Sequence, residues 1–346
     1  MKIHNVFKIL SVLHGAPTEI QREVGRKFSL IVTGTPELST FFTSELMKDV
    51  VREKNEEFAS DGRPVQIKTT KLPVESEDNL AVSGDAVICL LSADDATNEN
   101  LRAYRRLYKV IPCIHLFIER PTNKEEKAVL LRRLEENQIV GCELIRALTR
   151  ETITDTFEAV LDINKKISMA MAYRLPVLRP AMAKKIINGT AAQNMLIAFA
   201  SSLPQQLPVI GVVIGLLSVA GETTVLTINQ LKMCMQLAGI YGLELYVPDR
   251  LKELWPLIGS AIGLRAIART AVGFMPLAGP ALKGTIAYSG TYLIGETVRW
   301  FYSSGRMLTE DERERIYIKA CMRALDLLEN YLKKIKDPPP ASESAN

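Results

Sequence analysis

The stretch from Gly34 to Phe41 lies where a phosphate-binding loop would stand, directly after a short apolar run. Such a loop has the pattern Gly-x-x-x-x-Gly-Lys-Ser/Thr. Its backbone N–H groups approach the phosphates, its lysine neutralises them, and its hydroxyl holds magnesium. Aligned on Gly34, the last three places are taken by Ser39, Thr40 and Phe41. We interpret Gly34, Ser39 and Thr40 as a degenerate phosphate loop and expect no bound cofactor.

Two further nucleotide motifs are absent. Lys68, Thr69, Thr70 and Lys71 stand where Asp-x-x-Gly would contact the terminal phosphate, and 119–122 replaces the base-reading Asn-Lys-x-Asp. The nearby sequence 123–126, Asn-Lys-Glu-Glu, is better explained as the start of a solvated helix over 125–136. These losses argue against GTP hydrolysis, so we expect the protein not to be an enzyme. The alternative is an atypical NTP-binding enzyme in which Thr40, Lys68 or Arg120 rebuilds the phosphate site.

Other catalytic or metal-binding arrangements have few candidates. The five cysteines are widely spaced, which predicts reduced, buried thiols and no metal site. Only three histidines are present, and His115 lies in an apolar run typical of a strand. The formal net charge of +4 is too small to indicate a nucleic-acid partner. The first residues show no signal-peptide pattern, so we expect a cytoplasmic N-terminal domain.

The elements that would position the loop follow an alternating pattern from 27 to about 165. Apolar runs at 28–32, 65–69, 86–91 and 111–118 predict strands, and amphipathic segments at 39–58, 98–108 and 125–136 predict helices. Alternation of this kind indicates an α/β domain with a mostly parallel sheet. Its opening strand-turn-helix and the order that follows resemble the doubly wound Ras-like GTPase fold, in particular the Era-like domains of bacteria.

The C-terminal half is unusually apolar. No charged residue occurs from Ile186 to Gly221, although prolines at 204 and 208 interrupt this stretch. A bilayer span takes about 20 apolar residues, so a simple span is doubtful. The arms 190–203 and 208–220 predict a helical hairpin, which either enters a bilayer partway or is buried in a soluble helical domain. Glycines four or five residues apart, at 211 and 215, 259 and 263, and 279 and 284, would let helices approach closely.

An ordered series of motifs runs through this half. It comprises Leu-Pro-Val-Leu-Arg at 175–179, Ile-Ile at 186–187, Thr-Ala at 190–191, Asn-Met-Leu-Ile at 194–197, the 204–208 break, Gln230 with Met233, Tyr-Gly at 241–242 and Gly-Thr-x-x-Ile-Gly-Glu at 290–296. The series resembles the YcjF-type domain of unknown function over roughly 174–305. The resemblance implies a membrane-associated bacterial domain that often follows an Era-like GTPase; it does not imply a chemistry.

Polar residues within the apolar half are the candidates for membrane or partner contacts, because buried charge is costly unless it is paired or used. They are Asn194, Glu222, Arg265, Arg269, Glu296 and Arg299. Glu296 and Arg299 could instead pair on one helix. Arg174, Arg179, Lys184 and Lys185 precede the first arm and would face anionic headgroups, or else form a solvated linker.

Together these features predict an N-terminal segment (1–24), a degenerate GTPase-like α/β domain (25–166), an all-α, glycine-rich helical domain (167–335) and a disordered tail (336–346). A capping box at 309–312 opens the last helix, whose apolar face would include Ile316, Ala320, Ala324, Leu327 and Tyr331.

We expect a membrane-associated pseudo-GTPase that acts as an interaction or regulatory protein at the cytoplasmic face of a bacterial inner membrane, or in the cytoplasm. Expected partners are membrane lipid and an unidentified protein, and homo-oligomers are allowed. A membrane-remodelling or pore-type helical protein is a further alternative.

Overall fold

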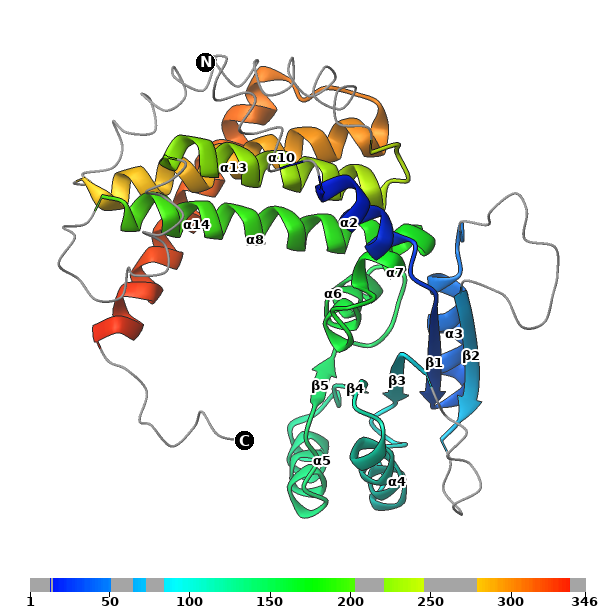
Figure 1. Cartoon of the computed structure of the whole chain (residues 1–346). Helices are drawn as coiled ribbons and strands as arrows, with labels where there is room; N and C mark the ends of the chain where they lie inside the picture. Colours follow the sequence, from blue (N-terminus) through cyan, green and yellow to red (C-terminus); the bar gives the residue numbers. More distant parts are fainter. Residues whose placement is uncertain are drawn as a thin grey trace. The chain divides into compact units, whose positions relative to one another are not determined.

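The computed structural model describes residues 13, 15–50, 65–72, 84–202, 221–245 and 279–336, and these residues form two compact units (Figure 1). One unit is Gln21–Met182, and the other combines Met1–Ile20 with Ala183–Asn346. The sequence placed the boundary at 167. The structure keeps 167–182 with the α/β unit because helix α7 (Ser168–Arg174) and the short 3-10 helix η2 (Pro176–Leu178) pack against α6 (Ile153–Ile163).

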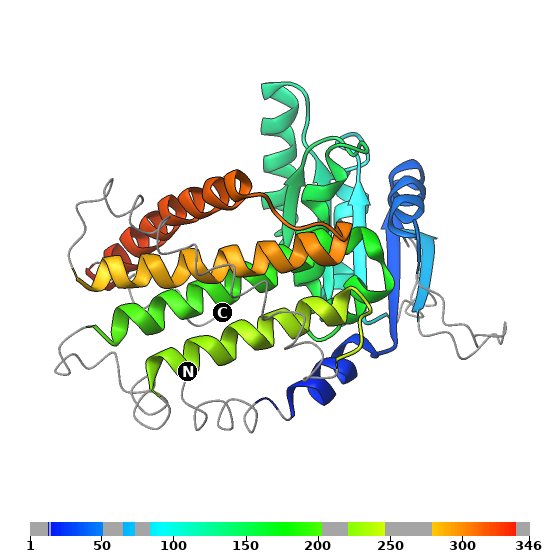
Figure 2. The ribbon, with the colours of Figure 1, turned by 90° about the horizontal axis from the view of Figure 1, so that it is seen from above.

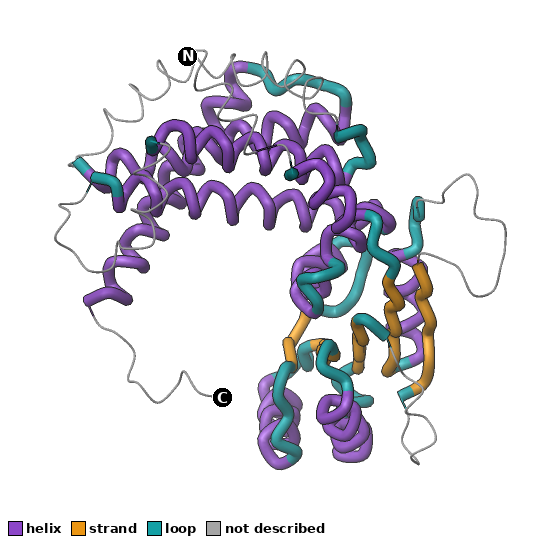
Figure 3. The backbone as a smooth tube through the Cα atoms, in the orientation of Figure 1, coloured by secondary structure: helices purple, strands orange, loops and turns teal. Residues whose placement is uncertain are grey.

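A five-stranded sheet of parallel strands forms the centre of the α/β unit, with the strand order β2-β1-β3-β4-β5 (Figure 3). The strands are β1 (Phe28–Gly34), β2 (Val65–Lys71), β3 (Ala86–Leu91), β4 (Ile114–Glu119) and β5 (Cys142–Ile145). All six side chains of β3 are buried, as expected for a central parallel strand with both faces covered. An α/β domain with a parallel sheet is therefore confirmed.

Helices cover both faces of the sheet. Alternate residues of β3, among them Cys89, join a buried cluster with residues of α4 (Asn98–Val110) and Leu130 of α5 (Lys124–Glu136). Because successive strand residues point to opposite faces, the other side chains of β3 face the second layer. That layer contains α3 (Pro36–Leu46) and α6, whose Phe42 and Phe157 rings lie 5.9 Å apart.

Several element bounds differ from the predicted ones. Helix α3 begins at Pro36, three residues earlier than predicted, because proline suits the first helical turn. It ends at Leu46, and Asp49 has a left-handed backbone with φ 55°; residues 51–58 of the predicted helix lie outside the described residues. Strand β4 begins at Ile114 because Ile111 still caps α4 and proline follows at 112. The short edge strand β5 was not predicted.

The other unit contains α8 (Arg179–Ala200), α10 (Glu222–Ile240), α13 (Pro280–Ser304) and α14 (Glu310–Lys336), with α2 (Ala16–Val24) crossing its N-terminal boundary. Helices α8, α10 and α13 lie side by side (Figure 2), and α13 also packs along α14. Buried residues of α8, α13 and α14 share one cluster that includes Met195, Tyr288 and Ala324. The predicted helical region is therefore present.

Helices α8 and α13 approach closely at glycines. A Cβ atom on Gly295 would lie 2.7 Å from Ile187 Cγ1, and one on Gly284 would lie 3.3 Å from the Met195 carbonyl oxygen. Either contact is too short for a comfortable fit, so the absence of a side chain permits the approach. This agrees with the small-residue packing predicted around Gly284, whereas the glycines at 211, 215, 259 and 263 lie outside the described residues.

The last helix has the predicted capping box. The Thr309 N–H donates to Glu312 Oε2 at 2.9 Å, and the Glu312 N–H donates to Thr309 Oγ1 at 3.3 Å. Its buried face is turned slightly from the predicted one and contains Tyr317, Ala320, Cys321, Ala324 and Leu328. The predicted tail from 337 onward lies outside the described residues.

The apolar hairpin is described only in its first arm, which forms the C-terminal half of α8 and ends at Ala200. The second arm, 208–220, lies outside the described residues, as does most of 254–282. Among the helices that the structure describes, none combines the length and the apolar character needed to cross a bilayer.

Candidate functional site

The carboxyl ends of β1 and β3 form the point where the strand order reverses. Strand β1 lies between β2 and β3, so the chain leaves β1 toward one edge of the sheet and later returns to add strands on the other side. Ligands of open parallel sheets bind in the crevice at such a point. A pocket of about 220 Å³ lies here, lined by Gly34, Thr35, Pro36, Lys71, Leu72, Leu91, Asp95 and Asn100.

Gly34 is required by the packing of β1 against β3. Its φ is +120°, and a Cβ atom would lie 1.9 Å from the Leu90 carbonyl oxygen. That same oxygen accepts a hydrogen bond of 2.8 Å from the Thr35 N–H. One N–H group at the start of the turn is therefore used within the sheet, and the glycine has a structural role independent of any phosphate.

A carboxylate, Asp95, organises the rest of the pocket. Its Oδ2 accepts hydrogen bonds from Thr35 Oγ1 at 2.5 Å and from Ser92 Oγ at 2.9 Å. The Ser92 N–H donates to Thr35 Oγ1 at 3.0 Å, and Asn100 Nδ2 donates to the Asp95 carbonyl oxygen at 2.7 Å. This network joins the turn after β1 to the segment after β3 and leaves an acidic group at the switch point.

The charges around the pocket are mixed. The turn from Gly34 to Phe41 contains Glu37 and no basic residue, while Lys71 is the one basic residue among those that line the pocket. Lys71 lies opposite Gly34 in the register of β1 and β2. The site therefore differs from a phosphate loop, in which the lysine belongs to the loop itself.

Only Gly34 of the three predicted loop residues lines the pocket. Ser39 is fully buried in α3, and its Oγ has no hydrogen-bond partner among the described residues. Thr40 is exposed. Of the residues considered for a rebuilt site, Lys68 is exposed on β2, and Arg120 Nε donates to the Leu144 carbonyl oxygen at 2.9 Å.

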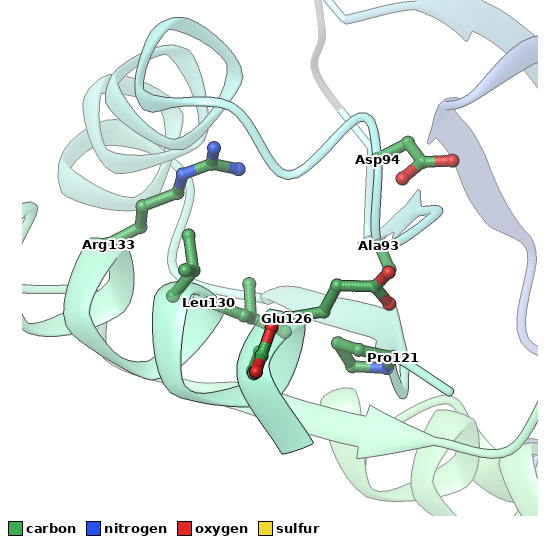
Figure 4. A pocket seen from close by; sticks show the side chains of 8 residues that line it. Ala93, Asp94, Pro121, Glu126, Leu130 and Arg133 are labelled. Atoms are coloured by element: carbon green, nitrogen blue, oxygen red, sulfur yellow. The ribbon is translucent and has the colours of Figure 1, made fainter. Parts of the chain in front are cut away.

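The Asn-Lys-Glu-Glu sequence at 123–126 starts a helix, as predicted. Asn123 is the N-cap of α5, and its side chain accepts a hydrogen bond of 2.7 Å from the Glu126 N–H. Asparagine at this position satisfies a backbone donor that the helix leaves unpaired. Glu125 and Glu126 line a second pocket of about 400 Å³ between α5 and the segment after β3 (Figure 4).

Sequence analysis missed Thr35, Ser92 and Asp95. Ser92 and Asp95 follow the buried strand β3 directly, and polar residues at the carboxyl end of a central parallel strand are a recognisable signal for a site. Their mutual hydrogen bonds depend on the pairing of β1 with β3, however, which local pattern does not specify.

Asn194 is the most buried of the predicted polar residues in the helical unit. It has no exposed surface, and its Nδ2 donates to Thr291 Oγ1 at 3.0 Å. Its Oδ1 accepts from Asn229 Nδ2 at 2.8 Å, and Gln230 Nε2 donates to Thr291 Oγ1 at 3.0 Å. The network connects α8, α10 and α13, so Asn194 aligns three helices.

Glu222 and Glu296 both have cationic partners. Glu222 Oε2 lies 2.5 Å from Lys283 Nζ and 2.6 Å from Ser201 Oγ, at one end of α8, α10 and α13. Glu296 pairs with Arg299 at 2.7 Å, as predicted for residues three apart on one helix. Pairing on one helix therefore accounts for Glu296 and Arg299. The other two predicted residues, Arg265 and Arg269, lie outside the described residues.

Of the basic residues before the first arm, Arg174 is buried, Arg179 and Lys185 are partly buried, and Lys184 is exposed. Arg174 is 3% exposed, and its guanidinium lies 5.2 Å from the centre of the Tyr173 ring. Arg179 donates to the Tyr173 carbonyl oxygen at 3.1 Å. Arg174 is thus part of the packing around α7, because this segment folds with the α/β unit.

The thiols and His115 do not form a reactive centre. All five cysteines are free; three are buried as predicted, whereas Cys113 and Cys142 are only partly buried. Burial raises the pKa of the Cys142 thiol to about 12 and that of Cys89 further still. Burial also lowers the pKa of His115, a half-buried residue of β4, against the opposing effect of Glu143. No group of His, Cys, Asp or Glu suited to a metal ion occurs in the part of the chain that the structure describes.

No family model matches this sequence, and no curated protein matches it.

Proposed function

We propose that the protein is a non-catalytic pseudo-GTPase that acts as an interaction or regulatory protein at the cytoplasmic face of a bacterial inner membrane. The observation that carries the proposal is the Asp95 network at the switch point. It occupies the Thr35 hydroxyl, and the turn that carries Thr35 has no lysine to neutralise a phosphate. The Ras-like relationship of the α/β unit is part of the proposal and rests on the strand-turn-helix opening, since the order β2-β1-β3-β4-β5 is shared with flavodoxin-like sheets.

Phosphate binding is disfavoured here by charge and by lost donors. An unscreened like-charge contact costs on the order of several kcal/mol at the effective dielectric near a protein surface. The Thr35 hydroxyl donates to the Asp95 carboxylate, and the Thr35 backbone N–H donates to the Leu90 carbonyl oxygen. Neither donor is free for a ligand. Glu37 adds a second negative charge in the first turn of α3.

Membrane association is proposed from the helical unit. Its support is the uncharged stretch from 186 to 221 and the resemblance to the YcjF-type domain. Hydrogen bonds across helices, such as those of Asn194, are one way in which helices associate where no water is available. On this account the helical unit holds the protein at the membrane, and the α/β unit presents a binding surface to a protein partner.

Nucleotide binding tests the proposal for the α/β unit. The full-length protein is titrated with fluorescent GTP and ATP analogues in the presence of magnesium. We expect no saturable binding at nucleotide concentrations up to about 1 mM. A dissociation constant of that size corresponds to a binding free energy of only about 4 kcal/mol. Saturable, magnesium-dependent binding at micromolar concentration would refute the loss of nucleotide binding on which the non-catalytic assignment rests.

Lys71 favours a second candidate function, an atypical NTP-binding enzyme. It lines the same pocket as Gly34 and Thr35 and could neutralise a phosphate from the neighbouring strand. The Lys71→Ala variant separates the two functions. Under the second candidate it abolishes nucleotide binding, whereas Lys68→Ala, the loss of an exposed lysine on the same strand, leaves binding intact.

A further inference from the structure

The pocket of about 400 Å³ is separate from the switch-point pocket and lies beside α5. Its lining residues are Ala93, Asp94, Pro121, Glu125, Glu126, Val129, Leu130 and Arg133. Figure 4 shows the Glu126 side chain extending from α5 toward Ala93 and Pro121, while Arg133 lies farther along the helix. The two sets of lining residues have no member in common, so a ligand could occupy this pocket with the Asp95 network intact.

The charge of the pocket is predominantly negative. Three carboxylates, of Asp94, Glu125 and Glu126, line it against one guanidinium, of Arg133. Arg133 donates to the Ala96 carbonyl oxygen at 3.3 Å. None of the three carboxylates has a hydrogen bond or ion pair with another side chain in the described part of the chain. Their full charge is therefore available to a cationic ligand.

The rest of the pocket is apolar. Ala93, Pro121, Val129 and the buried Leu130 provide hydrocarbon surface beneath the carboxylates. Val129 is 49% exposed although it is aliphatic and stands on the pocket wall. Arginine and lysine combine an apolar stem with a charged end, so their side chains match a pocket with an apolar floor and an acidic rim.

We propose that this pocket binds a basic peptide segment of a partner protein, which inserts one arginine or lysine side chain. The stem packs on Leu130 and Val129, and the cationic end pairs with Glu125 and Glu126. The inference rests on the proposed function, because it names the chemistry of the partner that the α/β unit would hold. The acidic rim disfavours phosphate-bearing ligands, including nucleotides and anionic lipid headgroups, since these would meet like charge.

The test uses full-length protein in mild detergent and a fluorescein-labelled hexa-arginine peptide, with binding followed by fluorescence anisotropy. The Glu125→Gln/Glu126→Gln variant removes two charges from the pocket. The matched control, Glu99→Gln/Glu135→Gln, removes two exposed charges of α4 and α5 that do not line it. We expect about tenfold weaker binding for the pocket variant and a change below about twofold for the control.

A third variant, Ala93→Leu, fills the pocket without changing its charge. We expect it also to weaken binding of the peptide about tenfold, because the leucine side chain would occupy the volume that the peptide arginine needs. Circular dichroism of each variant checks that the fold is kept. The Glu125→Gln/Glu126→Gln variant changes only an exposed helical turn, so it tests the proposal even if Ala93→Leu does not fold.

Three results would overturn the proposal: no binding of hexa-arginine above that of a hexa-glutamate peptide, equal weakening by the control variant, or binding of a fluorescent GTP that Ala93→Leu abolishes. The first two leave the membrane assignment and the absence of nucleotide binding intact, so failure of this inference is distinguishable from failure of the proposed function.

Discussion

At the scale of single residues, Gly34 shows how one residue type can serve two different purposes. Its place after the first strand led to its interpretation as part of a phosphate loop, whereas in the structure it lets β1 approach the backbone of β3. Sequence can show that a glycine stands at this turn. It cannot show which backbone the glycine must approach, because β3 lies more than fifty residues further along the chain.

Replacement of this glycine should be costly. In Gly34→Ala the new methyl group would overlap the Leu90 carbonyl oxygen, in a backbone conformation that side chains rarely adopt. We expect the free energy of unfolding to fall by about 3 kcal/mol or more, as measured by urea denaturation. Gly189→Ala, on an exposed turn of α8 with nothing within 4 Å, should leave stability unchanged or raise it by about 0.5–1 kcal/mol. Equal stabilities of the two variants would contradict the close β1–β3 contact.

Asp95 and Ser92 mark the limit of sequence reasoning at this scale. Their polar types after a buried strand indicate a site, but their role comes from hydrogen bonds to Thr35 across the sheet, which the local pattern does not specify. By contrast, Asn123 and Thr309 were predictable as helix starts, because a cap bonds to a backbone group only three residues away.

At the scale of elements, the central strands were predictable because they are almost wholly apolar. Strand β3 was placed correctly over its full length. Strand β5 was missed because it is short, lies at the edge of the sheet and buries only Ile145. Helix α3 was predicted too far toward the C-terminus, since apolar spacing continues beyond the position where the helix ends.

Helix packing in the second unit leads to a paired prediction on α13. Gly295 faces Ile187 of α8 with no room for a methyl group, whereas Gly290 has nothing within 4 Å. We expect Gly295→Ala to lower thermal stability by separating the two helices. Gly290→Ala should raise it slightly, because alanine has the better helix propensity by up to about 1 kcal/mol. The midpoints of thermal unfolding, followed by circular dichroism, compare the two variants; equal midpoints would contradict the close contact of α8 with α13.

At the scale of the whole molecule, the change in composition along the chain predicted two parts. It did not predict the boundary between the two compact units, which falls after Met182. Tyr173 and the surrounding residues look like the start of an apolar helical region, yet α7 packs on α6 of the α/β unit. The boundary falls inside α8, where a continuous helix gives no break in pattern. A truncated chain should therefore end at Met182, so that α7 and η2 keep their packing.

Fractionation of cells that express the protein tests the central claim, that the helical unit holds it at a membrane. Full-length protein and the chain ending at Met182 are compared after carbonate washing and then detergent extraction. We predict that full-length protein stays with the membranes through carbonate and is released by detergent, while the truncated chain is found in the soluble fraction. Recovery of both proteins in the soluble fraction would contradict the account and make the apolar helices the core of a soluble domain.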